Sequence, residues 1–304
     1  MPASYRKAWI GLGLLITLIV IATPDVRAQG DDVITVDSSI VVMNASVTDA
    51  SGKAVGGLGQ KQFHVFEDGT EQTIQSFDAE ETPFAAVILL DTSGSMEERV
   101  ALARAAAIQF LGGLRADDVA AIYNFDRKVE LVQDFSNSHD MVDKFFDLKA
   151  DGTTVLNDAI YRAADALSKR PEKRRAIIVL SDGADTTSSK SADKALKAAL
   201  AVNATIYSVD MSSPDLKPAE KAANKGALTN FAEKTGGRYV ETPGGVAMRD
   251  AFRRIVEELG QQYTIAYQPS NTAKDGKWRA IKLVISRPNL NIRTRKGYNA
   301  PKSN

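Results

Sequence analysis

The sequence of 304 residues contains no cysteine. The chain can therefore form no disulfide bond and cannot be anchored through a lipid-modified cysteine. Its hydrophobic fraction of 44% and its charged fraction of 25% are typical of a globular protein that is long enough to bury a substantial core. The hydrophobic core alone must therefore stabilise the fold. The chain is long enough for one large domain or two modest ones.

The sequence also lacks an excess of charge of either sign. Its 38 Lys and Arg residues balance 38 Asp and Glu residues. Without net positive charge the chain has no general attraction for nucleic acid or for an anionic membrane. One basic stretch lies near the C-terminus, and we expect a solvated edge strand with a loose end there. Its basic residues are Arg287, Arg293, Arg295, Lys296 and Lys302.

Long apolar runs are absent except at the N-terminus. Two positive charges in MPASYRK precede the apolar stretch from Ala8 to Ala22, and small residues follow in TPDVRA. Residues 1–28 therefore predict a secretory signal peptide. The stretch is shorter than the ~20 residues that cross a bilayer, which favours cleavage after Ala28, with an uncleaved anchor as the alternative. The expected location is exported, either periplasmic or secreted to the cell surface.

Two short segments at the ends of the mature chain have strand character. Residues 31–82 contain the alternating patterns SSIVVMNASV and QFHVFEDGTEQTI, with tight turns at DASGK and EDGT. Residues 261–298 contain QQYTIAYQP, RAIKLVIS and LNIRTRKG, and 299–304 form a tail. Each segment is too short to close a sandwich and would leave a sheet edge open. Together they predict one small β-sandwich of about six strands.

Residues 83–260, between these segments, alternate strands with helices. The expected strands are AAVILL, VAAIYNF, KVELVQ, RRAIIVL, ATIYSVD and GRYVE. The expected helices are RVALARAAAIQFLGGL, SHDMVDKFFDL, VLNDAIYRAADALSK, SADKALKAALA, KGALTNFAEKTG and GVAMRDAFRRIVEELG. This alternation predicts an α/β fold with a doubly wound, mostly parallel sheet that is inserted into the sandwich.

Small oxygen-bearing side chains gather where these strands end. Asp91-Thr92-Ser93-Gly94-Ser95 follows AAVILL, Asp151-Gly152-Thr153-Thr154 precedes VLNDAI, and Ser181-Asp182-Gly183-Ala184-Asp185 follows RRAIIVL. Functional loops of open α/β sheets lie at the carboxyl ends of strands. Carboxylates and hydroxyls suit a hard divalent cation, Mg²⁺, Mn²⁺ or Ca²⁺, whereas zinc prefers the histidine and cysteine that these loops lack.

The three loops resemble a known metal site. DTSGS, followed by a Thr in GTTVLNDAI and an Asp in IIVLSDGAD, resembles the metal-ion-dependent adhesion site (MIDAS) of von Willebrand factor type A (VWA) domains. With its flanking segments the chain is also similar to exported bacterial VWFA-related proteins. The alignment places the ligand threonine at Thr154 rather than at Thr153.

The resemblance implies a set of ligands and a function. Ser93, Ser95 and Thr154 would bind the metal through hydroxyls, and Asp91 and Asp182 would act largely through bound water. Because such a shell is mostly neutral, the cation stays electrophilic and can accept a carboxylate from a partner protein. The resemblance thus implies an exported, metal-dependent, adhesion-type protein-binding module without enzymatic activity.

Two other functions fit parts of the same pattern. A structural component of the cell envelope could use the metal only to brace its loops. A Mg²⁺-dependent phosphoryl-transfer enzyme would need a nucleophilic Asp and usually a second acid two residues later, where this chain has Ser93. The sequence contains no phosphate-binding glycine loop and no G-x-S-x-G elbow, so an enzyme is not expected.

Three further acidic residues lie near the predicted site in the sequence. The polar run Asp185, Thr186 and Thr187 could line the rim of the site, but a cap of the following helix, SADKALKAALA, is favoured. Asp158 could approach the metal or lie on a polar helix face. Asp210, at the end of ATIYSVD, could lie at the rim of the site or close a turn.

Overall fold

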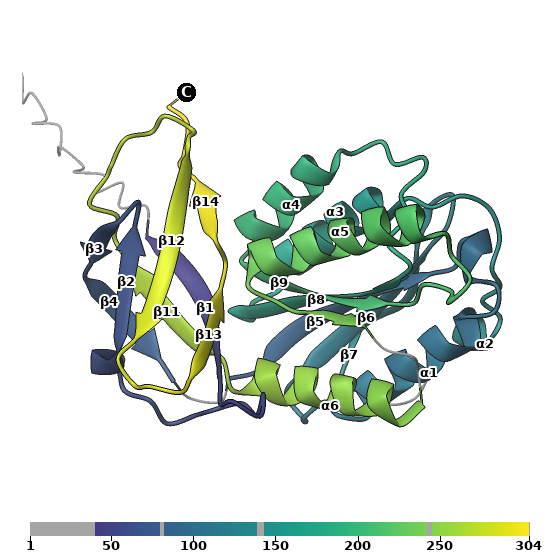
Figure 1. The fold of residues 1–304 in the computed structure, drawn as a ribbon, viewed down its shortest axis with the longest axis horizontal. Helices are drawn as coiled ribbons and strands as arrows, with labels where there is room; N and C mark the ends of the chain where they lie inside the picture. The colour runs from purple at the N-terminus through teal and green to yellow at the C-terminus, as the bar shows by residue number, and fades with distance from the viewer. Residues whose placement is uncertain (1–39, 80–81, 139–142, 242–244, 304) are drawn as a thin grey trace, which may run out of the picture. The chain divides into compact units, whose positions relative to one another are not determined.

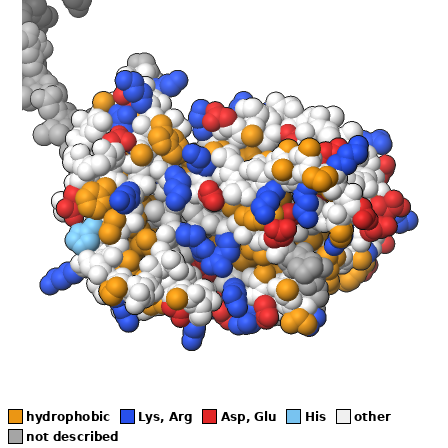
Figure 2. Space-filling view, viewed as in Figure 1, with side chains coloured by type: hydrophobic (Ala, Val, Ile, Leu, Met, Phe, Trp, Pro, Cys, Tyr) orange, Lys and Arg blue, Asp and Glu red, His pale blue; other side chains and the backbone are white. Residues whose placement is uncertain are grey.

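The computed structural model describes residues 40–79, 82–138, 143–241 and 245–303. The predicted signal peptide, residues 1–28, lies outside the described residues. Among the helices that are described, none has the length and apolar character needed to span a membrane. Basic and acidic side chains both occur across the face shown in Figure 2, as the balanced composition requires.

A six-stranded sheet forms the centre of the α/β part, in the order β10-β9-β8-β5-β6-β7. The strands are β5 (Phe84–Asp91), β6 (Val119–Phe125), β7 (Val129–Ser136), β8 (Arg174–Ser181), β9 (Ala204–Asp210) and β10 (Tyr239–Glu241). All pairings are parallel except that of β7 with β6. Every residue of β5 is buried, because helices cover both faces of the sheet. The predicted doubly wound, mostly parallel sheet is confirmed.

Helices pack on both faces of this sheet (Figure 1). One face contacts α1 (Val100–Leu111) and α6 (Gly245–Gly260) through Phe84, Ala86 and Ile88 of β5. The alternate residues of β5 pack against the other layer, which consists of α3 (Leu156–Ser168), α4 (Ala192–Ala201) and α5 (Pro218–Thr235). A short helix, α2 (Asp143–Phe146), lies beside β7. The two helix layers fix β5 and β8 so that the carboxyl ends of these neighbouring strands lie side by side at one end of the sheet.

Two four-stranded antiparallel sheets form the β-sandwich. One sheet has the order β13-β1-β11-β4 and the other β14-β12-β2-β3. Their strands are β1 (Val41–Thr48), β2 (Phe63–Glu67), β3 (Thr70–Gln72), β4 (Ile74–Asp78), β11 (Tyr263–Tyr267), β12 (Trp278–Ile285), β13 (Asn291–Thr294) and β14 (Gly297–Asn299). A short 3-10 helix, η1 (Gln60–Gln62), precedes β2. Each sheet combines strands from both ends of the chain, which confirms the predicted split sandwich.

The C-terminal basic residues depart from the expectation of a solvated edge. Arg295 is only 8% exposed, and Arg293 forms an ion pair with Glu258 of α6. The backbone amide of Lys296 donates to the Lys234 carbonyl of α5, at 3.0 Å. The prediction was wrong for Arg293 and Arg295 because the chain between β13 and β14 runs against the helices of the α/β part rather than along a free edge.

Candidate metal-binding site

The first loop brings three predicted ligands together. Asp91 is the last residue of β5 and is fully buried, and a short 3-10 helix, η2 (Gly94–Met96), follows Ser93. The Oδ1 atom of Asp91 accepts hydrogen bonds from the backbone amide of Ser93 at 2.9 Å and from its hydroxyl at 2.6 Å. The hydroxyl oxygens of Ser93 and Ser95 are 3.1 Å apart. The alternating spacing of these residues therefore presents three oxygen-bearing side chains at one place.

Ser181 connects this loop to the loop after β8. Its hydroxyl donates to Oδ2 of Asp91 at 2.5 Å and accepts the Gly183 amide at 2.9 Å. The next residue, Asp182, is 4% exposed, and its Oδ1 accepts the amide of Ala184 at 2.9 Å. Ser181 was not among the predicted site residues, because a hydroxyl at the end of a buried strand has no distinctive pattern. Its position directly before Asp182 was the available signal.

The second loop is joined to both of the others through backbone groups. The Asp151 amide donates to the Thr92 carbonyl at 2.9 Å, and the Gly94 amide donates to the Gly152 carbonyl at 3.1 Å. The Thr154 carbonyl accepts the amides of Thr186 and Thr187 at 2.9 and 3.1 Å. These bonds hold the three loops at one edge of the sheet.

The two threonines of the second loop face different surroundings. Thr154 is 3% exposed, and its amide donates to the Thr186 hydroxyl at 2.9 Å. Thr153 is exposed, and its hydroxyl lies 3.0 Å from that of Thr187. Thr154 is therefore buried within the loop cluster, and Thr153 lies on its outer surface.

Two glycines allow the second and third loops to pass close to neighbouring segments of the chain. Gly183 has φ +86°, and a Cβ atom there would lie 2.6 Å from the Asn224 carbonyl oxygen. Gly152 has φ +77°, and a Cβ atom there would meet the Arg127 side chain at 2.5 Å. L residues rarely adopt such positive φ angles, so glycine is required at both turns.

The electrostatic state of the site is set by burial. Burial raises the pKa of Asp91 to about 6, hydrogen bonds from Ser181 and Ser93 oppose the rise, and the charge of Asp182 adds to it. Two buried carboxylates close to each other are costly unless a cation or protons compensate them. A divalent cation would supply that charge, so the donor chemistry fits a hard metal ion. In the described part of the chain, no group of three or more His, Cys, Asp or Glu side chains could hold a metal, so hydroxyls would have to complete the shell.

The three further acidic residues have local structural partners. Asp185 accepts hydrogen bonds from the Ser188 hydroxyl at 2.6 Å and from the Asn157 amide group, whereas Ser191 caps α4. The expectation that Asp185 caps this helix was wrong, since the helix begins after Ser191 rather than directly after the loop. Asp158 braces the third loop by accepting the amides of Ser189 and Lys190, at 2.9 and 2.8 Å.

Asp210 closes a turn, as one of its two interpretations predicted. It accepts the Ser212 amide at 2.8 Å and the Tyr239 hydroxyl at 2.5 Å. Ser212 follows β9 and Tyr239 begins the neighbouring β10, and together they donate to both carboxylate oxygens of Asp210.

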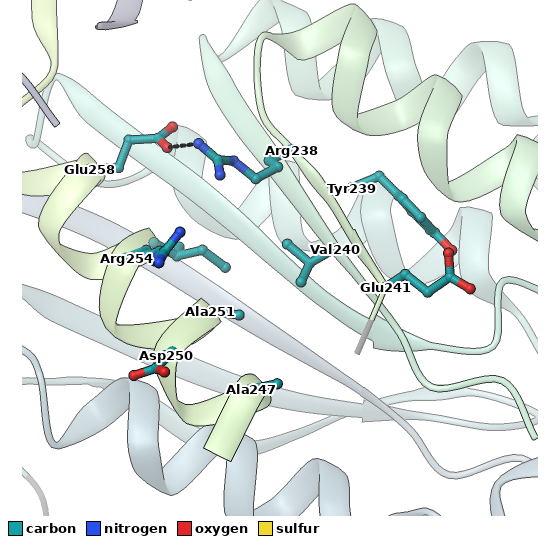
Figure 3. Close-up of a pocket in the computed structure, with 10 residues that line it drawn as sticks. Arg238, Tyr239, Val240, Glu241, Ala247, Asp250, Ala251, Arg254 and Glu258 are labelled. Carbon is teal, nitrogen blue, oxygen red and sulfur yellow. Dashed lines mark hydrogen bonds and ion pairs between the residues drawn. The ribbon is translucent and has the colours of Figure 1, made fainter. Parts of the chain in front are cut away.

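A separate hollow of about 480 Å³ lies between β10 and α6 (Figure 3). The buried acid of its lining, Glu258, is already paired. The Glu258 carboxylate accepts the Arg238 guanidinium at 3.3 Å and the buried Tyr207 hydroxyl at 2.7 Å, and it also pairs with Arg293. Because Glu258 already accepts from these donors, it has less need of a charged ligand than the buried carboxylates of the three loops have.

The doubly wound sheet, with oxygen-rich loops at the carboxyl ends of β5 and β8, defines an α/β domain with its candidate site at one end of the sheet. Residues 86–184 match the family model of the von Willebrand factor type A domain. The chain therefore contains a VWA domain. A search among curated proteins gave no match.

Solved structures with a similar fold come from several bacteria. A von Willebrand factor type A structure from Catenulispora acidiphila is 14% identical, with 87% of this chain and 74% of that chain covered and a TM-score of 0.49. The PilB minor pilin from Streptococcus sanguinis is 15% identical, with 63% and 64% covered and a TM-score of 0.47. BatB from Bacteroides thetaiotaomicron is 16% identical, with 58% and 98% covered and a TM-score of 0.47. The chain thus spans less than two thirds of the length of the pilin it resembles.

Proposed function

We propose that this protein is an exported, metal-dependent protein-binding module. Asp91, Ser93, Ser95, Thr154 and Asp182 would hold one divalent cation, and a carboxylate from a partner protein would complete its coordination. The observation that carries the proposal is the convergence of the first and third loops on Asp91, whose two oxygens accept from Ser93 and from Ser181. Mg²⁺ is the first choice of metal, and Mn²⁺ or Ca²⁺ would suit the same oxygens.

The composition of the shell supports a role in binding. Three of the five proposed ligands are hydroxyls, which carry no charge, so two carboxylates face a cation of charge +2. The site then carries no excess of negative charge that would repel another carboxylate, and a carboxylate from outside could be held by direct coordination to the cation. Ser95 is exposed whereas Asp91 and Asp182 are buried, so the accessible side of the site is its hydroxyl side.

The surroundings of Asp91 favour binding over phosphoryl transfer. A nucleophilic carboxylate needs a free oxygen within reach of the substrate. Asp91 is fully buried, and both of its oxygens accept hydrogen bonds. A broad phosphatase and esterase screen is expected to detect no hydrolysis, and turnover that Asp91→Ala abolishes would contradict the proposal.

A structural role for the metal is the second candidate. The three loops are already joined by backbone hydrogen bonds, so a cation could brace them without binding a partner. Under this alternative, Ser93→Ala would lower the melting temperature in Mg²⁺ and leave partner capture unchanged. Under the binding proposal, capture falls together with metal affinity.

The decisive experiment is a pull-down from an envelope extract in Mg²⁺, with the same capture repeated in EDTA. We expect Asp182→Ala to weaken capture by about 30-fold or more, since removal of a buried charged partner costs ~2 kcal/mol or more. Asp165→Ala, which removes a partly exposed acid of α3, is the matched control and should capture normally. A partner that is retained equally well in EDTA and by Asp182→Ala would refute the mechanism.

A further inference from the structure

A second pocket, of about 550 Å³, lies beside α4 and β14, which are neighbours in the fold (Figure 1). Its walls come from the start of β1, the C-terminal turn of α4 and the segment around β14. Much of its lining is apolar and includes Ile40, Val41, Val42, Leu200 and Pro301. Its volume is within the range of ligand pockets in proteins.

The charges that line this pocket are all positive. Lys197 and Arg295 are its charged lining residues, and neither Asp nor Glu is among the described residues of the lining. Lys197 is an exposed residue of α4 and pairs with Asp193, at 2.7 Å. The pocket therefore combines an apolar wall with a positive one.

Arg295 is an unusual cation because it is buried and has no anionic partner among the residues that the structure describes. It is 8% exposed, and its Nε is buried and has no hydrogen-bond partner among the described residues. One amino group donates to the Leu200 carbonyl at 3.3 Å, and the guanidinium lies over the Tyr298 ring, with 5.7 Å to the ring centroid. Burial lowers the pKa of Arg295 below its ordinary value. Buried charges in proteins are normally paired with an opposite charge.

Partial compensation comes from the C-terminus of α4. The last carbonyls of a helix carry about half a negative charge, and arginine side chains often bond to them. The Leu200 carbonyl that Arg295 contacts is one of these groups. A half charge does not balance the full charge of the guanidinium, and the nearby Lys197 adds no negative charge, since its own partner is Asp193. In addition, the side-chain amide nitrogen of Asn203, in the same lining, is buried without a partner in the described structure.

We propose that this pocket binds a carboxylate that is attached to an apolar body. The carboxylate would lie beside Arg295 and Lys197, and the Asn203 amide could donate to it. The apolar part would lie against Ile40, Val42 and Leu200. Two sources share this chemistry, a free aliphatic acid and the C-terminal residue of a peptide. The site is independent of the proposed metal site.

Binding of matched acid and neutral probes tests the proposal. Isothermal titration calorimetry of the whole protein would compare octanoate with octan-1-ol, and acetyl-Val-Ala-Leu with its C-terminal amide. We expect at least one acid to bind about tenfold or more tightly than its neutral counterpart, as hydrogen bonds to charged groups permit. That acid should also raise the melting temperature. The acid that binds identifies the source of the carboxylate. Equal binding of acid and neutral probe, or binding of neither acid, would overturn the proposal.

Two variants locate the binding in this pocket. Arg295→Met should abolish acid binding, and Lys197→Glu should weaken it by about tenfold through charge reversal at an exposed position. Lys194→Glu makes the same charge change one turn earlier on α4, outside the lining, and should bind normally. If Arg295→Met does not fold, the comparison of Lys197→Glu with Lys194→Glu decides the question. Equal weakening by those two variants would show a general charge effect and contradict the assigned site.

Discussion

Replacement of Glu258 by alanine is expected to lower the free energy of unfolding by about 3–5 kcal/mol, the range for removing one partner of a buried ion pair. Glu258 lies near the end of α6 and is 4% exposed. Its carboxylate accepts from Tyr207 of β9 and pairs with Arg238 and with Arg293 of the sandwich. Without it, two guanidinium groups would face each other with no anion between them, since the charge of Arg293 already lowers the pKa of Arg238, after the larger effect of burial.

Chemical denaturation at pH 7.5 measures this effect, and two variants calibrate it. Glu258→Gln keeps the size and an acceptor oxygen but loses the charge, so its loss of stability should be smaller. Glu257→Ala removes the adjacent exposed acid, which pairs with Arg253 at 3.0 Å, and should change stability by about 0.5 kcal/mol or less. Similar stability of Glu258→Ala and Glu257→Ala would show that the buried cluster contributes nothing to the fold.

The strands and helices of the α/β part could be predicted from the sequence, because buried elements there have a clear pattern of apolar residues. Strands such as β5 and β8 are covered on both faces and therefore appear as unbroken apolar runs. The split sandwich could be predicted for a related reason, since neither terminal segment has enough strands to close by itself. The structure has eight strands rather than about six. One of the additional strands, β14, arises because the C-terminal basic stretch crosses from β13 in one sheet to β14 in the other, and another is β4, which pairs with β11.

Side-chain pairings between distant segments could not be predicted. Glu258 and Arg293 are separated by 35 positions, and nothing in the local pattern of either residue indicates a partner. The same is true of Arg295 and the Leu200 carbonyl, which belong to different parts of the fold. Local periodicity reports which face of a strand is buried, but it does not report what lies across the interface.

The candidate metal site could also be predicted only in part, because contacts between neighbouring residues leave a pattern in the sequence and contacts between distant residues do not. The spacing of Asp91, Ser93 and Ser95 is local, and the structure brings these side chains together. The hydrogen bond from Ser181 to Asp91 spans 90 positions and was not foreseen. It is this contact that fixes the orientation of the Asp91 carboxylate and leaves neither of its oxygens without a donor.

In the absence of metal, Asp91→Asn is expected to make the protein more stable at pH 7.5, by up to about 3 kcal/mol. The pKa of Asp91 rises from an ordinary 3.8 to about 6 in the folded chain, mainly through burial. One pKa unit corresponds to about 1.4 kcal/mol, which sets this upper limit. The gain is smaller if the new amide group meets the Ser181 hydroxyl poorly. A substitution that stabilises the fold while it removes a proposed ligand is expected where function requires buried charge.

The pH dependence of the free energy of unfolding provides a second test of the sign of this effect. Because the folded pKa of Asp91 lies above the unfolded value, the folded state binds more protons between about pH 4 and 6. The contribution of Asp91 to stability is therefore most favourable below this window and is lost as the pH rises through about 6. In EDTA, the stability difference between Asp91→Asn and wild type should grow from pH 5 to pH 7.5.

Addition of Mg²⁺ at pH 7.5 should reverse the order of the two proteins. The cation would compensate the Asp91 and Asp182 charges in wild type, and so raise its melting temperature, whereas Asp91→Asn would respond weakly. Differential scanning calorimetry measures the melting temperature of both proteins in Mg²⁺, with and without a 10-fold excess of chelator. If Mg²⁺ stabilised both proteins equally, the cation would be bound elsewhere. If neither responded, the two buried carboxylates would be compensated by protons alone, and the proposed metal-dependent contact with a partner would have no basis.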